Sequence, residues 1–409
     1  MAKILYLSYD GMTDSLGQSQ VLPYMSGLSA LGYEIHILSF EKPLAFEKRK
    51  ETVSKHIKER NLHWHPMLYT SRPPVLSTMM DVRKMKKKAK QLHREHGFHL
   101  VHVRSYIPAL AALMLKQEFS LPFIFDMRGL WADERVDGGL WNLKNPLYKL
   151  IYRYFKKKEQ VFLKEAARVI SLTNAAIPVL KKISGNEHLS TEVIPCCVDT
   201  EHFDYKRFSE EEKSAARTQL DIGAEDFVLS YLGSLGTWYM LDEMLDFFAE
   251  LKIRIPRSKF LFISHDDPLI ILQKAHLKGI SPEDIVVYSA TRDEVPAMLR
   301  VSDANIFFIR PVFSKQASSP TKMAEVLAMG IPVVANSGVG DIEQQILENG
   351  VGSIVRDFNI AEYNRVIDEL SLLQKISSEQ CRGVALSLYN LADGIGKYAD
   401  CYRKVLGAG

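Results

Sequence analysis

Short apolar runs alternate with amphipathic stretches from the start of the chain. Mostly apolar runs predict buried strands of a parallel sheet at 3–9, 34–40, 99–105, 122–127 and 168–173. Between these runs, apolar residues recur at the spacing expected for helices. One helix is predicted at 17–31, with Pro23 in its first turn and Gly32 just past its end. The series predicts a doubly wound α/β sheet.

The alternation stops once and then restarts. Residues 190–227 contain a proline, an extended piece and a charged helix, which is typical of a domain boundary. Further apolar runs then predict a second sheet of similar size, at 227–236, 259–267, 284–290, 304–309, 331–337 and 350–355. The helical C-terminal segment is predicted to pack back on the first domain. We therefore predict one domain of residues 1–195 with 387–409, and a second domain of residues 196–386.

The composition is that of a large globular protein. The 409 residues are 46% hydrophobic and 25% charged, which is sufficient for two cores. A net charge of +3 gives little support to nucleic-acid binding. The four cysteines lack metal-ligand spacing and fit a reducing compartment. The first residues resemble a strand rather than a signal peptide, and no apolar stretch approaches the roughly 20 residues that span a bilayer. A cytoplasmic protein is therefore expected.

The strongest functional signal lies at 314–346. A loop of small polar residues leads to Pro320 near a predicted helix start, and Glu325 follows about one turn later. The N–H groups of a first helical turn favour a phosphate anion. Glu325 could accept hydrogen bonds from vicinal sugar hydroxyls, such as those of a nucleotide ribose. The alternative interpretation is that the Ser and Thr residues here only cap the helix.

Four stretches carry a family resemblance, and they follow the family's order along the chain. SPTKMAEVLAMGIPVVANSGVGD resembles the donor-site segment of the family 4 glycosyltransferases, VIPCCVDTEHF resembles their hinge, and YLGSLGTWYMLDEMLDFF resembles the loop that opens their second domain. SYDGMTDSLGQSQVLPYM resembles their first-domain loop, which approaches the donor phosphates and the acceptor. The resemblance implies the GT-B fold: two Rossmann-like doubly wound domains facing a central cleft, with a C-terminal helix crossing back to the first domain. It also implies retaining transfer of a hexose from a nucleoside diphosphate sugar to a saccharide or lipid-linked acceptor, in envelope polysaccharide or glycolipid synthesis.

The chain departs from the family pattern at two places in the second domain, and in the first domain at Arg128, near which relatives often have a His. The family's donor motif often has two Glu residues separated by seven others; Glu325 fits the second, but Ala317 stands at the first. The loop that opens the second domain usually supplies an Arg and a Lys for the diphosphate, whereas Ser234 and Tyr239 stand there. The positive charge is then expected from basic side chains elsewhere in the second domain, namely Lys322, Arg310, Lys315 or Arg292.

The resemblance and the residue chemistry together give a set of candidate site residues. The second domain is expected to bind the donor and the first domain the acceptor. The candidate donor-binding residues are Gly17, Gly233, Ser234, Arg292, Ser318, Ser319, Thr321, Lys322 and Glu325. The candidate catalytic residues are Asp126, Arg128 and Lys322. Helix N-termini and basic side chains can meet the donor charge, so no metal or other cofactor is expected.

Two loops of the first domain are candidates for the acceptor. The loop at 8–25 follows the first strand and contains Gly17, which would allow close approach of a diphosphate, while Asp14 and Ser15 would meet the acceptor. The loop at 126–146 is dense in charged residues and tryptophans, which suit a sugar, and contributes Trp131 and Glu134. The alternative for this second loop is a surface segment tied by ion pairs.

Other features leave alternatives open. The basic stretch at 81–97 either rests on an anionic membrane, at the inner face, or is a solvated helix face. His63 and His65 alternate on a strand without a third ligand nearby, which favours a structural role. His265, at the end of a second-domain strand, could touch a donor. Two other functions fit the same fold: a nucleotide-sugar epimerase and a non-catalytic subunit that supports an active partner.

Overall fold

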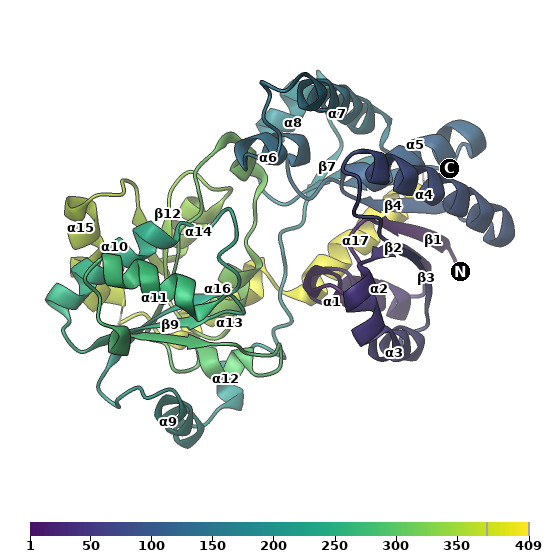
Figure 1. Cartoon of the computed structure of the whole chain (residues 1–409). Helices are drawn as coiled ribbons and strands as arrows, with labels where there is room; N and C mark the ends of the chain where they lie inside the picture. The colour runs from purple at the N-terminus through teal and green to yellow at the C-terminus, as the bar shows by residue number, and fades with distance from the viewer. Residues whose placement is uncertain (374, 408–409) are drawn as a thin grey trace. The chain divides into compact units, whose positions relative to one another are not determined.

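A computed structural model describes residues 1–373 and 375–407, and it divides the chain into two compact units (Figure 1). The first unit is Met1–Pro195 with Leu391–Gly409, and the second is Cys196–Asn390. The chain returns to the first unit at Leu391 rather than at the predicted residue 387. The reason is that Val198 of the second unit bridges Asn390 and donates its N–H to the Tyr389 carbonyl at 2.8 Å.

The first unit is built on a seven-stranded sheet whose neighbouring strands are all parallel. Its order is β3-β2-β1-β4-β5-β6-β7. The strands are β1 (Lys3–Ser8), β2 (Glu34–Glu41), β3 (Leu62–Leu68), β4 (Leu100–Arg104), β5 (Phe123–Asp126), β6 (Arg168–Ser171) and β7 (Thr191–Val193). The order reverses between β1 and β4, so the loops after these strands flank the position where doubly wound sheets bind ligands.

Nine helices among the described residues of the first unit connect and cover these strands. They are α1 (Ser15–Gln20), α2 (Leu22–Ala30), α3 (Pro43–Glu59), α4 (Leu76–His96), α5 (Tyr106–Phe119), α6 (Trp131–Asp137), α7 (Pro146–Glu165), α8 (Ile177–Ser184) and α17 (Leu391–Leu406). The single helix predicted at 17–31 is two helices, because the backbone of Val21 leaves the helical region (φ −125°, ψ −62°) and α2 then begins at Leu22, with Pro23 in its first turn.

The second unit repeats the plan with a six-stranded parallel sheet in the order β10-β9-β8-β11-β12-β13. The strands are β8 (Phe227–Leu232), β9 (Ser258–Ile263), β10 (Ile285–Tyr288), β11 (Ala304–Phe307), β12 (Val333–Asn336) and β13 (Gly352–Val355). The helices are α9 (Glu210–Gln219), α10 (Leu241–Arg254), α11 (Pro268–Leu277), α12 (Val295–Leu299), α13 (Thr321–Ala328), α14 (Ile342–Asn349), α15 (Ile360–Leu373) and α16 (Ser378–Leu388). Short 3₁₀ turns lie at Tyr205–Arg207, Pro282–Asp284 and Phe313–Ala317.

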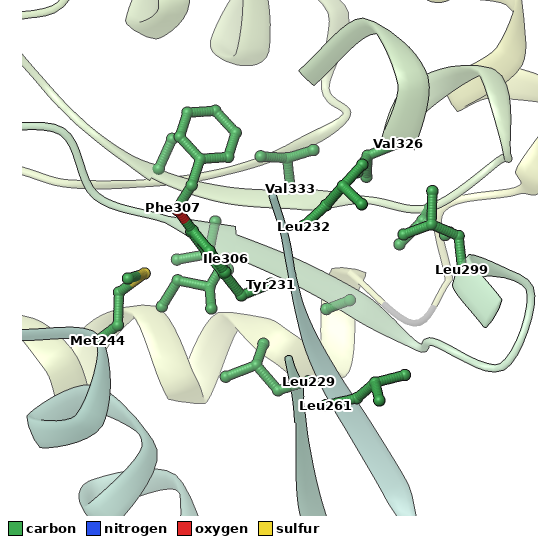
Figure 2. Close-up of a cluster of buried hydrophobic side chains, with 14 of the residues drawn as sticks. Leu229, Tyr231, Leu232, Met244, Leu261, Leu299, Ile306, Phe307, Val326 and Val333 are labelled. Atoms are coloured by element: carbon green, nitrogen blue, oxygen red, sulfur yellow. The ribbon is translucent and has the colours of Figure 1, made fainter. Parts of the chain in front are cut away.

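The core of the second unit holds its central strands against helices on both faces. Figure 2 shows Leu229 and Tyr231 of β8 among side chains from neighbouring strands and helices, including Met244 of α10 and Val326 of α13. All four side chains are fully buried. This packing fixes the N-terminal turn of α13 beside the carboxyl end of β8, where the site described below is built.

The C-terminal helix α17, yellow in Figure 1, is anchored in the first unit by buried polar contacts. The Tyr398 hydroxyl donates to Asp126 Oδ2 at 2.8 Å, and the Tyr402 hydroxyl lies 2.8 Å from His102 Nδ1. Helix α2 meets α17 at Gly27, where an added Cβ would lie 2.3 Å from Ile395 Cδ1. Among the described residues, no helix combines the length and the apolar character needed to cross a membrane.

Candidate functional site

A buried lysine lies at the centre of the candidate site in the second unit. Lys322 is the second residue of α13, and only 7% of its surface is exposed. Its Nζ lies 3.9 Å from the centre of the Tyr231 ring and 3.4 Å from the centre of the Tyr239 ring. Among the described residues, no hydrogen-bond acceptor reaches this Nζ. A buried nitrogen with three potential donors and no acceptor is costly, so it marks a place where an anion would be stabilised.

The loop after β8 converges on this lysine. Gly233 has a positive φ of +95°, and a Cβ added there would lie 3.6 Å from Lys322 Nζ. The Tyr231 hydroxyl donates to the Ser234 carbonyl at 2.8 Å, which fixes the turn, while the Ser234 side chain is exposed. Leu235 N donates to Asp266 Oδ2 at 2.6 Å. The glycine therefore lets backbone or ligand atoms approach the lysine closely.

Burial dominates the electrostatics of this lysine. Desolvation lowers the pKa of the Lys322 amine well below its usual range, although Glu325 and Asp266 act in the opposite direction. An anion placed against Nζ would raise that pKa again, because it stabilises the charged form. Protonation of Lys322 and binding of a negatively charged ligand therefore favour each other.

Glu325 lies about one helical turn after Lys322 and faces a second cation. Its side chain is 12% exposed, and Arg292 Nη1 approaches its Oε1 at 3.5 Å. Burial raises the pKa of Glu325, and Arg292 and Lys322 only partly offset this. The Arg292 guanidinium also lies 5.5 Å from the centre of the Phe203 ring. Glu325 is held in place but still partly reachable, as a residue that accepts hydrogen bonds from ligand hydroxyls must be.

The start of α13 is not capped by a side chain. Its N-cap residue is Pro320, and among the described residues no side-chain cap hydrogen bond is found there. Ser319 Oγ instead accepts from Cys196 N at 3.2 Å, and Ser318 N donates to the Lys315 carbonyl at 3.2 Å. The structure therefore does not support the alternative in which Ser318, Ser319 and Thr321 serve as helix caps.

The other residues of the second unit that the sequence suggested for donor binding differ in burial and in their contacts. Ala317 is buried, with 1% of its surface exposed, so no carboxylate occupies that position. Lys315 is buried with its Nζ 3.7 Å from the centre of the Trp238 ring, and its carbonyl accepts from Gly340 N at 2.9 Å. Arg310 is exposed. His265 pairs with Ser289 Oγ at 2.6 Å. Lys322 is therefore the candidate cation placed directly beside Gly233.

A separate cavity of about 510 Å³ lies elsewhere in the second unit, beside α9. Its lining includes Arg217, whose guanidinium donates to the carbonyls of Gly223, Ala224, Asp226 and Val301 at 3.0 to 3.2 Å. This arginine is used by the protein's own backbone, and the predicted donor-binding residues do not line this cavity, so we do not assign the donor to it.

In the first unit, Gly17 shapes the loop after β1. A Cβ there would lie 2.1 Å from the Gly11 carbonyl oxygen and 2.6 Å from Met12 Cα. The close approach that requires glycine is thus to the protein's own loop, and the residue is buried. The contact of Gly17 with a diphosphate stays a prediction.

Sequence reasoning missed the residue that organises this loop. Glu41, fully buried at the end of β2, accepts hydrogen bonds from Met12 N at 2.8 Å and from Thr13 N and Oγ1 at 3.0 and 2.7 Å. A carboxylate of the protein thus binds N–H groups that an anionic ligand could have used. A charged residue ending an otherwise apolar strand was the available signal in the sequence.

The predicted acceptor residues of this loop lie at the start of α1. Asp14 is the N-cap residue, its side chain is 19% exposed, and its Oδ2 lies 3.0 Å from Lys42 Nζ. Ser15 follows it and is exposed. Both residues lie after the carboxyl end of β1, next to the point where the strand order reverses.

Asp126 is buried rather than open to an acceptor. It ends β5 with 1% of its surface exposed, and Tyr398 holds its Oδ2. Burial alone would raise the pKa of this carboxyl, but Arg128 and His102 outweigh it and lower the pKa. Arg128, whose φ is +56°, places Nη1 3.8 Å from Asp126 Oδ2. We correct the prediction of a direct catalytic contact: this geometry makes Asp126 a positioning residue.

Trp131 and Glu134 lie on α6, in the loop predicted to contact a sugar. The Trp131 ring packs against Tyr106, Trp141 and Phe155, with ring centres 4.9 to 5.8 Å apart. Glu134, in the first turn of the same helix, is partly exposed. The aromatic ring is therefore largely used for packing, and Glu134 is the predicted acceptor residue of α6 that keeps part of its surface exposed.

Comparison with known proteins follows the division into two units. Residues 20–202 match the protein family described as Glycosyltransferase Family 4, and residues 212–383 match the one described as Glycosyl transferases group 1. A search of curated proteins finds no match for the sequence.

Solved structures resemble the chain over its whole length. Sucrose-phosphate synthase from Thermosynechococcus elongatus has a TM-score of 0.76 at 15% identity, with 100% of both chains covered. Anabaena HepE, solved in complex with UDP-glucose, has a TM-score of 0.68 at 13% identity, with 98% of this chain and 99% of that chain covered. WaaG, a glycosyltransferase involved in lipopolysaccharide biosynthesis, has a TM-score of 0.68 at 16% identity, with 97% and 99% covered.

The same fold is also found in an epimerase. UDP-GlcNAc 2-epimerase from Neisseria meningitidis, bound to UDP-GlcNAc, has a TM-score of 0.60 at 12% identity, covering 98% of this chain and 100% of that chain. At such identities a structural likeness shows the fold alone, so the sequence families decide the assignment. With two parallel Rossmann-like sheets and both family matches, the chain is a GT-B glycosyltransferase and belongs to glycosyltransferase family 4.

Proposed function

We propose that this protein transfers a hexose from a nucleoside diphosphate sugar to an acceptor hydroxyl, with retention of anomeric configuration. The observation that supports this most directly is the Lys322 amine, which is buried beside Gly233 and has no acceptor within the described part of the chain. A diphosphate placed there would supply the missing acceptors and the negative charge. Few other ligands of a glycosyltransferase carry both.

The donor would be held by three neighbouring features of the second unit. The diphosphate would lie against Lys322 and the first N–H groups of α13, which favour an anion. The Gly233 turn would let it approach the backbone closely. Glu325, about a turn further on, would accept hydrogen bonds from the ribose hydroxyls, with Arg292 keeping the carboxylate in place. Ser234, Ser318, Ser319 and Thr321 would line the same turn.

The chemistry would rest on stabilising the departing diphosphate. Lys322 and the α13 N-terminus would concentrate positive potential where charge develops as the glycosidic bond breaks. In a front-face route, the leaving phosphate would itself accept the acceptor's proton, so that no separate nucleophile is needed. Ala317 fits this route because it offers no side chain that could attack the sugar.

The first unit would bind the acceptor through the loop after β1 and through α6. Asp14 offers a partly exposed carboxylate, Ser15 an exposed hydroxyl and Glu134 a second, partly exposed carboxylate. Arg128, held near Asp126, would add a guanidinium. An acceptor from envelope polysaccharide or glycolipid synthesis fits the work of WaaG in lipopolysaccharide biosynthesis.

Peripheral membrane contact through residues 81–97 would suit a lipid-linked acceptor at the inner membrane face. Most of this segment belongs to α4, whose buried residues are Ser77, Asp81, Met85, Ala89 and Leu92. The lysines of α4 lie outside this buried set of residues. Near the start of the helix, Met79 and Met80 are 49% and 48% exposed. Binding to anionic vesicles, lost in high salt, would support the contact; binding to neutral and anionic vesicles alike would contradict it.

We further propose that the transfer needs no metal, because Lys322 and the helix N-terminus supply the positive charge. Initial rates measured with and without a chelator should then agree under conditions where the chain stays folded. A rate that collapses with the chelator and returns with Mg²⁺ or Mn²⁺ would contradict this.

The function is tested by calorimetry with UDP, GDP and ADP, followed by product analysis with the nucleotide sugar that binds. Binding should be tight for one base and weakened in Lys322→Met. The transferase should release the diphosphate only when an acceptor is present. Conversion of the donor alone into an epimer would identify an epimerase, and binding without turnover would identify a non-catalytic subunit. Proton NMR of the new linkage would report retention or inversion.

A further inference from the structure

A cluster of histidines lies at the other end of the first sheet from the loops discussed so far. Parallel register places His36 of β2 opposite His63 of β3, and His65 follows two residues later on the same face. His96 reaches the same place from the last turn of α4. His36 stands near the start of β2, so the cluster is at the amino ends of these strands, whereas ligands of doubly wound sheets bind at the carboxyl ends.

The distances within the cluster suit a metal ion. His36 Nδ1 lies 3.0 Å from His65 Nε2. One ring nitrogen from each of His36, His65 and His96 falls within a group whose members all lie within 4.8 Å of one another. Ligand atoms of a tetrahedral site with metal–nitrogen bonds of about 2.0–2.1 Å are separated by about 3.3 Å. Small rotations of the two partly exposed rings, His65 and His96, would reach that spacing.

Glu34 lies next to the three histidines and contacts the second ring nitrogen of His36. Its Oε1 lies 3.1 Å from His36 Nε2, so the carboxylate accepts the proton carried by that nitrogen. This leaves the lone pair of His36 Nδ1 directed at His65. A carboxylate that fixes the second nitrogen of a ligating histidine is a recurrent feature of protein metal sites.

The surroundings of the cluster suit a transition metal rather than Ca²⁺ or Mg²⁺. Three imidazoles supply the ligand atoms. Lys3 Nζ lies 3.7 Å from Glu34 Oε1, so the surroundings are not an acidic cage. Zinc and its neighbours prefer imidazole nitrogen.

We propose that His36, His65 and His96 bind one Zn²⁺ ion, which fastens the edge strand β3 and the end of α4 to β2. His65 passes its proton from Nε2 to Nδ1, and the metal takes the place between the two facing nitrogens. A water molecule fills the fourth position. The site stabilises the first unit and takes no part in glycosyl transfer.

The test uses the full chain, freed of any affinity tag and stripped of metal, titrated with Zn²⁺ against a chromophoric chelator. One ion per chain is expected, with nitrogen neighbours at about 2.0–2.1 Å by X-ray absorption. His65→Gln and His96→Gln should each weaken binding by more than 100-fold. Glu34→Gln should weaken it by about 10–100-fold, as expected for a residue that orients a ligand. Zn²⁺ should also raise the melting temperature of the unmodified chain and not that of His96→Gln.

Two controls make the outcome decisive. His188→Gln removes an exposed histidine outside the cluster and should leave Zn²⁺ affinity unchanged. His63→Gln tests the neighbouring group of Glu34, His36 and His63, whose ligand atoms also lie within 4.8 Å of one another. If His63→Gln abolishes binding while His96→Gln does not, the ligand set is wrong. If neither substitution matters, or Mg²⁺ binds equally well, the proposal fails.

Discussion

Replacing Lys322 by methionine should stabilise the free protein while it damages ligand binding. Methionine keeps the length and the apolar stem of lysine but removes the buried nitrogen that has no acceptor among the described residues. An unsatisfied buried polar group costs about 1–3 kcal/mol in protein mutational data. The free energy of unfolding of the second unit should therefore rise by about that amount in Lys322→Met.

The gain should depend on pH in a defined direction. The pKa of Lys322 is lower in the folded state than in the unfolded chain. Below the folded pKa the full cost of holding a buried charge is present, and it declines as the pH rises toward the ordinary lysine value. The stabilisation by Lys322→Met should thus be largest at low pH and smallest in alkaline buffer.

The same substitution should weaken diphosphate binding. A hydrogen bond to a charged group contributes about 1.5–3 kcal/mol, which corresponds to about a 10- to 150-fold rise in Kd. Calorimetry of the unmodified protein in buffers of different ionisation enthalpy should show proton uptake on binding, because an anion raises the lysine pKa. Its affinity should fall as the pH rises between the free and bound pKa values.

Lys274→Met is the matched control. Lys274 pairs with Asp242 at 2.5 Å on the surface of the same unit, with its side chain 38% exposed. Its loss should change stability by less than about 1 kcal/mol and leave binding intact. A Lys322→Met protein that is less stable than the unmodified one, yet binds the diphosphate normally, would refute the assignment of this lysine.

Three further substitutions test other parts of the site. Glu325→Gln should raise the Kd for the nucleotide by at least about tenfold, and unchanged affinity in calorimetry would sink its assignment to the ribose. Asp126→Asn should lower the free energy of unfolding of the first unit by about 3–5 kcal/mol at neutral pH, and the difference should shrink in acid as the carboxylate is protonated. A lower kcat with unchanged stability in denaturant melts would instead support a direct catalytic role. Gly17→Ala should lower the free energy of unfolding by about 1–3 kcal/mol in the same melts, because its Cβ would strike backbone atoms. Gly396→Ala, in a helix with open space around the glycine, should not lower it. Equal effects of the two substitutions would contradict the packing argument.

The sequence located the donor-side turn because the evidence for it is local. Pro320 and Gly330 bracket α13, and helical spacing puts Glu325 one turn inside it. The environment of Lys322 could not be predicted in the same way. It depends on Tyr231 and Tyr239, which precede the lysine by some 80 to 90 residues. Only the packing of β8 against α13 brings those rings over the amine.

The histidine cluster shows the same limit more sharply. His63 and His65 were visible as an alternating pair, and a third ligand was missing because only sequence neighbours could be searched. His36 joins them through strand register, and His96 joins them because α4 ends beside the sheet. The role of Glu41 could not be predicted for the same reason, since its hydrogen-bond partners lie on a loop about 30 residues earlier. Pairing of distant segments is set by the whole sheet, which no local pattern encodes.

Lys322 and Asp126 are both buried ionisable side chains, but they differ in how far the protein itself pairs them. The Asp126 Oδ2 receives the Tyr398 hydroxyl, and Arg128 and His102 lie within 3.8 Å of it, so the protein itself offsets much of the cost of that charge. Lys322 Nζ has no hydrogen-bond acceptor among the described residues, and the two aromatic rings, Glu325 and Asp266 offset only part of its desolvation. A ligand that binds only the folded protein would supply the missing acceptor and so stabilise the second unit by mass action. Saturating nucleotide should therefore raise the melting temperature of the unmodified chain far more than that of Lys322→Met, while Asp126→Asn should leave the size of this ligand-induced shift unchanged.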